Sequence, residues 1–158
     1  MSLALADRAA LSDLVHRYAA YVDDRQFDAV AALFTDSAVL TVPDPPAALV
    51  PIHTHRGRDA ITGAVAAVVQ AVRTEHAIVG EVYDEGTRPG IARGRITCIA
   101  HHWTARSNQG SDEIVDVVWH LRYDDEYELT GALWQISHRA LTINAIETRP
   151  VRRLLPRE

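Results

Sequence analysis

The sequence predicts an α+β fold in which a strongly curved mixed sheet wraps around a long N-terminal helix, with two shorter helices completing the domain. Two observations predict it. The first third of the chain carries apolar residues at helical spacing, and the second half changes to long alternating stretches separated by turn residues. Helices followed by an antiparallel meander are typical of α+β proteins. At 158 residues the chain has the length of one domain, spanning 1–158, with a basic tail from about residue 146.

The helices are predicted from apolar stripes. The long first helix carries residues at spacings of three and four: Leu11, Leu14, Val15, Tyr18, Ala19 and Val22. A short second helix has its own stripe: Phe27, Val30, Ala31 and Phe34. Asp59 is placed to cap a third helix. Its inner face is expected to hold four residues: Ile61, Val65, Val68 and Val72.

Strands and loops follow from β-branched residues and from turn chemistry. A short strand is expected at 38–42, and four longer ones at roughly 76–83, 91–104, 113–123 and 132–143. Proline cannot donate to a sheet ladder, so a cluster of four predicts a loop after the short strand: Pro43, Pro45, Pro46 and Pro51. An acidic loop ending at Gly131 is expected to separate the last two strands.

Composition excludes several classes of protein. The net charge of −5 argues against nucleic-acid binding, which normally shows as a basic excess. No stretch is apolar for the roughly 18 residues of a membrane span. The single cysteine, Cys98, cannot form an internal disulfide, so nothing points to an oxidising compartment. We therefore expect a cytoplasmic protein that binds neither nucleic acid nor membrane.

Asp23 is the first candidate for chemistry, because it lies near the end of the first helix. There a carboxylate meets the negative end of the helix dipole, and a dry pocket disfavours its charge further, so we expect a raised pKa and a better base. His76 is the second candidate, because imidazole titrates near neutral pH. From the residues alone, both could instead be structural or solvated side chains.

Short motifs, in order along nearly the whole chain, resemble SnoaL-like proteins of the NTF2-like superfamily. The matching segments are 14–18, 22–25, 32–36, 56–61, 74–76, 122–128 and 134–136, followed by Arg139. The resemblance implies a cone-shaped barrel around one deep apolar pocket. The superfamily includes scytalone dehydratase, bile acid 7α-dehydratase and hexachlorocyclohexane dehydrochlorinase. It also includes polyketide cyclases, oxygenase small subunits and proteins without catalysis, so the fold does not settle the function.

The resemblance also implies a set of site residues. The family's catalytic aspartate and histidine match Asp23 and His76, in which the carboxylate would fix the imidazole tautomer. Tyr18 matches a pocket tyrosine that can donate to developing negative charge. Arg139 matches a pocket arginine that holds an anionic group, although its neighbour His138 competes for the inward direction.

Strand alternation suggests residues that would contact the substrate. His102 shares a face with Ile96, Cys98 and Ala100, and a register slip of one residue would exchange it with His101. We expect His102 to orient the substrate, with Val22 and Trp119 also in contact with it. Trp119 could instead belong to an oligomer contact.

His53 and His55 can place two imidazoles on one side of a strand, but no convincing further ligands accompany them. We therefore expect neither a metal nor another cofactor.

The sequence favours a cofactor-free lyase or isomerase, dehydratase-like, acting on a small apolar cyclic or polyketide-like substrate. The alternatives are a polyketide cyclase, a non-catalytic ligand-binding or assembly module, and an oxygenase small subunit. A homo-oligomer, dimer or trimer, is expected through the outer face of the strands.

Overall fold

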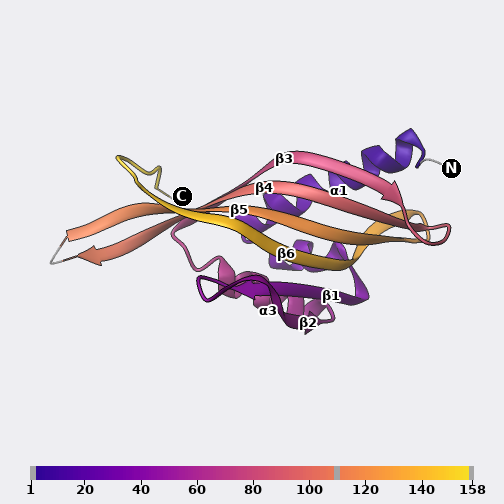
Figure 1. Cartoon of the computed structure of the whole chain (residues 1–158), viewed down its shortest axis with the longest axis horizontal. Coiled ribbons are helices and arrows are strands. Elements are labelled where there is room, and N and C mark those ends of the chain that lie inside the picture. The colour runs from indigo at the N-terminus through magenta and orange to yellow at the C-terminus, as the bar shows by residue number, and fades with distance from the viewer. Residues whose placement is uncertain (1–2, 109–110, 157–158) are drawn as a thin grey trace.

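The computed structural model describes residues 3–108 and 111–156, which form the predicted α+β fold: three helices and one six-stranded sheet (Figure 1). The helices are α1 (Leu5–Asp23), α2 (Phe27–Ala32) and α3 (Arg58–Val68). The strands are β1 (Phe34–Asp44), β2 (Ala48–Arg56), β3 (Arg73–Glu85), β4 (Ile91–Asn108), β5 (Ser111–Thr130) and β6 (Leu133–Pro150).

The sheet has the order β2-β1-β6-β5-β4-β3 and is mixed, as predicted. All neighbouring strands are antiparallel except β1 and β6, which run parallel. The pairing of β5 with β6 shifts register between His120 and Leu121 and again between Glu126 and Tyr127. Such irregularities bend a strand and increase its twist. In Figure 1 the long strands β3 to β6 extend along α1, with β1, β2 and α3 to one side.

The predicted stripe of α1 is confirmed, since its buried residues are the six expected: Leu11, Leu14, Val15, Tyr18, Ala19 and Val22. All of them except Ala19 pack with inward residues of the sheet into one core. Because this stripe must face the sheet along its whole length, the last turn of α1 brings Val22 and Asp23 close to β3.

The loop predicted from the prolines is wrong for most of its length. Residues 48–56 form β2, and only the turn between β1 and β2 is irregular. β2 pairs with β1 alone and is an edge strand. Pro51 is tolerated there because an edge strand has one side without ladder partners.

Two further boundaries differ from prediction. The cap of α3 is Gly57, with no side-chain capping bond, and Asp59 lies in the first turn instead. Phe34 begins β1 rather than ending α2.

The predicted inner face of α3 is wrong at its C-terminal end, because the helix stops at Val68 and the helical period ends there. Val69 is buried, whereas Val68 and Val72 are exposed.

The acidic stretch predicted as a loop before Gly131 belongs instead to β5. Residues 124–128 alternate across the sheet, so Asp125 and Tyr127 are buried. An inward carboxylate is tolerated because Asp125 pairs with Arg139 of β6. In the part of the chain that the structure describes, no helix is long and apolar enough to cross a membrane.

Candidate active site

A cavity opens between α1, α3 and the inner face of the sheet. Its walls are mostly aliphatic side chains. The remaining lining residues carry rings: Tyr18, His76, His102, Trp119 and Tyr123. An apolar cavity with a few polar groups is the usual form of a small-molecule site.

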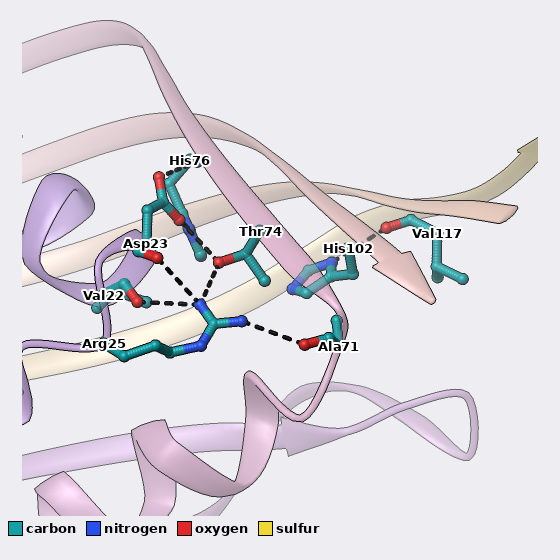
Figure 2. A network of polar contacts seen from close by, with 8 residues as sticks. All are labelled: Val22, Asp23, Arg25, Ala71, Thr74, His76, His102 and Val117. Atoms are coloured by element: carbon teal, nitrogen blue, oxygen red, sulfur yellow. Dashed lines mark hydrogen bonds and ion pairs between the residues drawn. The ribbon is translucent and has the colours of Figure 1, made fainter. Parts of the chain in front are cut away.

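Asp23 and His76 meet at the wall of this cavity, although they are more than fifty residues apart in the chain (Figure 2). The His76 ring nitrogen Nδ1 lies 2.7 Å from Asp23 Oδ1. The backbone N–H of His76 donates to Asp23 Oδ2 at 2.8 Å. The Thr74 hydroxyl donates to Asp23 Oδ1 at 2.9 Å. The carboxylate at the end of α1 is therefore held by the first residues of β3.

The electrostatics of Asp23 differ from the sequence expectation. Burial alone would raise the pKa of its carboxyl group, as we expected. The hydrogen bonds from His76 and Thr74 outweigh burial, and the pKa is lowered instead. The expectation of a raised pKa is therefore wrong. Asp23 remains a carboxylate at neutral pH and is not itself suited to be the base.

His76 is the group that this carboxylate orients. A carboxylate can only accept hydrogen bonds, so Nδ1 of His76 carries the hydrogen that points to Asp23. In the neutral ring the lone pair is then on Nε2. His76 lines the cavity. The arrangement can present a basic nitrogen to a bound molecule and stabilise the imidazolium that forms.

His102 is kept neutral by burial. Its Nδ1 lies 3.0 Å from the Val117 carbonyl oxygen and therefore carries the hydrogen. Burial lowers the pKa of the ring to about 4, which leaves Nε2 as an acceptor at pH 7. Nε2 is buried and has no hydrogen-bond partner among the described residues. The ring centroid lies 6.0 Å from that of His76 and 4.5 Å from that of Trp119.

The register predicted for β4 is correct. His102 is buried with Ile96, Cys98 and Ala100. His101 lies on the opposite face of β4, where its Nδ1 is 2.7 Å from Asp116 Oδ2. Val22 and Trp119, the other two expected contacts, both lie in the cavity wall.

Tyr18 lines the cavity, but Arg139 does not. Arg139 is fully buried and forms two hydrogen bonds to Asp125, at 2.8 and 2.6 Å. Its guanidinium carbon lies 4.2 Å from the ring centroid of Tyr18 and 4.1 Å from that of Tyr123. Burial raises the pKa of the Tyr18 hydroxyl, so it stays protonated. The structure thus resolves the inward direction in favour of Arg139 over His138, but places Arg139 behind the tyrosines that contact the cavity.

The two histidines considered as metal ligands, His53 and His55, do not line this cavity. His53 is exposed on β2, its Nε2 4.0 Å from a carboxylate oxygen of Asp44, and His55 is half-buried. Within residues 3–108 and 111–156, no three His, Cys, Asp or Glu side chains form a group that could hold a metal ion. The absence of a metal stays a prediction.

Sequence reasoning missed Thr74 and Arg25, which complete the surroundings of Asp23 (Figure 2). Arg25 donates to the Thr74 hydroxyl oxygen at 2.7 Å. Neither residue type indicates a site by itself. The available signal was position, because Arg25 follows Asp23 by two residues and Thr74 precedes His76 by two.

A family comparison agrees with this architecture. The model of the SnoaL-like domain matches residues 3–140, and the chain belongs to this family. No curated protein matches the chain.

Solved structures show the same fold. The chain is similar to hexachlorocyclohexane dehydrochlorinase LinA-type3 from Novosphingobium barchaimii LL02, at 21% identity, a TM-score of 0.75 and 97% coverage of each chain. It is similar to a protein provisionally named a scytalone dehydratase from Novosphingobium aromaticivorans, at 19% identity, a TM-score of 0.74, and 96% and 93% coverage. The protein Kfla4162 from Kribbella flavida is 26% identical, with a TM-score of 0.71, and 90% and 93% coverage. The family match and these neighbours show the SnoaL-like fold.

Proposed function

We propose that the protein is a cofactor-free lyase or isomerase that removes a proton from a carbon atom of a small, largely apolar cyclic molecule. The observation that carries this proposal is the hydrogen bond of 2.7 Å between Asp23 and His76 at the wall of an aliphatic cavity. A base held in the correct tautomer inside a dry cavity is what proton abstraction from carbon requires.

His76 has the central role. Its Nε2 lone pair takes the proton from carbon, and the electron pair of the broken C–H bond forms a new double bond. In an elimination, the adjacent carbon loses its leaving group, a halide ion or a hydroxyl that departs as water after gaining a proton. In an isomerisation, the electrons move onto a neighbouring carbonyl oxygen and the proton returns at another carbon. Asp23 stabilises the imidazolium in both cases.

The other polar groups would orient the ligand. Tyr18 keeps its hydroxyl hydrogen because burial raises its pKa, and it can donate to a carbonyl or leaving oxygen. His102 presents a neutral acceptor beside His76, which suits a hydroxyl group on the ligand. Arg139, behind Tyr18, would act on the tyrosine ring and not on the ligand.

The relatives support this proposal without fixing the reaction. One similar structure is named a dehydrochlorinase and another a dehydratase. Elimination of hydrogen chloride or of water includes loss of a proton from carbon, the step for which the pair is suited. At identities of 21% and 19% these structures show the fold, so the leaving group has to be found by experiment.

Two groups of compounds test the proposal: chlorinated cyclohexanes, and bicyclic ketones with a hydroxyl group β to the carbonyl. Elimination is followed as chloride or water loss by mass spectrometry and as the absorbance of the conjugated product. We expect wild-type protein to convert at least one group, and His76→Gln to lose roughly 10²–10⁴ of that rate. His55→Gln, on the edge strand and outside the cavity lining, is the matched control and should keep the rate.

The mostly aliphatic walls also fit the second candidate function, a non-catalytic binding module. That function predicts binding of such compounds without conversion, and equal behaviour of wild type and His76→Gln. Conversion that His76→Gln leaves unchanged would contradict the proposed mechanism.

A further inference from the structure

Arg25 has an unusual backbone conformation for a residue with a side chain. Its φ of 60° lies in the left-handed region. The chain there closes α1 with two hydrogen bonds, from Gln26 N to Tyr21 O at 2.8 Å and from Arg25 N to Val22 O at 3.1 Å. This is the Schellman arrangement, in which glycine normally occupies the left-handed position. An arginine at this position requires a compensating role for its side chain.

The guanidinium group of Arg25 joins three separate segments of the chain (Figure 2). It donates to the carbonyl oxygens of Val22 at 3.2 Å and Asp23 at 3.3 Å, at the end of α1. It also donates to the carbonyl oxygen of Ala71 at 3.3 Å, between α3 and β3. It donates to Thr74 Oγ1, at the start of β3, at 2.7 Å. Arg25 thus ties the segment that carries Asp23 to the one that carries His76.

The contact with Thr74 has a defined direction. A guanidinium can only donate, so the Thr74 oxygen accepts from Arg25. The single hydroxyl hydrogen is then left for Asp23 Oδ1, at 2.9 Å. The same carboxylate oxygen accepts from Nδ1 of His76. Donation from Arg25 also polarises the hydroxyl and strengthens its bond to the carboxylate.

We propose that Arg25 is a positioning residue of the site, which fixes the direction of the Thr74 hydroxyl and thereby holds the Asp23 carboxylate against His76. Only its catalytic consequence rests on the proposed function, because the hydrogen-bond geometry is independent of any reaction. Loss of Arg25 releases the carbonyl groups of Val22 and Ala71, which then compete for the Thr74 hydroxyl. Asp23 loses a donor that favours its charged form, so its pKa rises.

The test is a double-mutant cycle on Arg25→Met and Thr74→Val, with the Asp23 carboxyl titration followed by ¹³C NMR. We expect each single substitution to move the titration midpoint of Asp23 upward. If Arg25 acts through Thr74, Arg25→Met should have little further effect in the Thr74→Val background. Equal shifts in both backgrounds would overturn the proposal, because they would show a direct effect of the arginine charge. The same holds if neither substitution moves the midpoint.

Arg58→Met is the matched control for loss of a structural arginine. Arg58 holds the carbonyl oxygen of Phe34 with two hydrogen bonds, at 2.9 and 2.7 Å, and is outside the cavity lining. We expect it to lower stability without moving the Asp23 titration. Arg25→Gly relieves the left-handed backbone and provides a second variant if Arg25→Met folds poorly. Its Asp23 midpoint should also rise, and an unchanged midpoint would count against the proposal.

A kinetic measurement links the positioning to the reaction. We expect Arg25→Gly to lower kcat by roughly 10- to 100-fold, with a smaller change in KM. Added methylguanidinium should restore part of the lost kcat in Arg25→Gly but not in His76→Gln. If the Arg25 variants shift the Asp23 midpoint but the wild-type protein shows no activity, the positioning role stands and the proposed function is refuted. If the Arg25 variants keep full activity and an unshifted Asp23 midpoint, only the positioning role is refuted.

Discussion

Replacing Asp23 by asparagine should change the tautomer of His76. The two carboxylate oxygens accept from the Thr74 hydroxyl, from the backbone N–H of His76 and from its ring Nδ1. Asparagine keeps the shape but offers one oxygen and one NH₂ group, so at least one donor would meet another donor. The conflict is relieved when the hydrogen of the His76 ring moves to Nε2 and Nδ1 accepts from the new amide. Nε2 then donates to the cavity and can no longer act as the base.

The size of the effect follows from this change. An enzyme whose catalytic histidine is held in the wrong tautomer loses a factor of roughly 10²–10⁴ in turnover. The substitution also weakens hydrogen bonds to a charged group whose side chain is 20% exposed. We therefore expect a fall of about 1–3 kcal/mol in the free energy of unfolding.

The tautomer is read directly from the ¹⁵N shifts of the His76 ring, and turnover from any substrate that the wild-type protein converts. Asp13→Asn is the matched control, because Asp13 lies on the same helix and its side chain is 61% exposed. The control should keep both the tautomer and the rate. If Asp23→Asn keeps the Nδ1–H form of His76, or keeps full turnover, Asp23 does not set the tautomer on which catalysis depends.

Three further predictions concern stability, ligand choice and assembly. Because hydrogen bonds lower the pKa of Asp23 in the folded state, its contribution to stability is present above the unfolded pKa of about 3.9 and is lost as pH falls through the folded pKa. In urea denaturation, the free energy of unfolding of wild type should lie well above that of Asp23→Asn at pH 7, and the difference should close towards pH 3. A difference that does not change with pH would count against this linkage. The neutral acceptor on His102 should favour 2-naphthol over 2-methoxynaphthalene by roughly tenfold in Kd, and calorimetry should find no such preference in His102→Phe. On β3, Val79 and Val82 are 56% and 58% exposed, so we expect light scattering to give a dimer or trimer, and a monomer at high micromolar concentration would be the contrary result.

The fold could be predicted because its main signals are local. The stripe of α1 needs only the helical period. Alternation along β4 correctly grouped His102 with Ile96, Cys98 and Ala100, although a register slip that exchanges it with His101 was left open. The prolines misled because their effect on a strand depends on its place in the sheet. Pro51 is compatible with β2 only because that strand lies at the edge.

The electrostatics of the site could not be predicted in the same way. The end of α1 and a dry pocket both indicated a raised pKa for Asp23. The donors that lower it lie about fifty residues further along the chain, in Thr74 and His76. Arg139 is a similar case, since its inward direction was an open alternative. Its pairing with Asp125, within a stretch that read as an acidic loop, became visible only in the folded chain.

The central claim is that His76, held by Asp23, takes a proton from carbon in this cavity. The most direct test uses 2-tetralone, an apolar bicyclic ketone with an acidic C–H group and no leaving group, in deuterated buffer. Proton NMR follows the replacement of hydrogen by deuterium next to the carbonyl. We predict that wild-type protein speeds this exchange well above the buffer rate, and that His76→Gln loses roughly 10²–10⁴ of the acceleration. Exchange at the buffer rate while tetralone is bound, or equal exchange by His76→Gln, would contradict the claim.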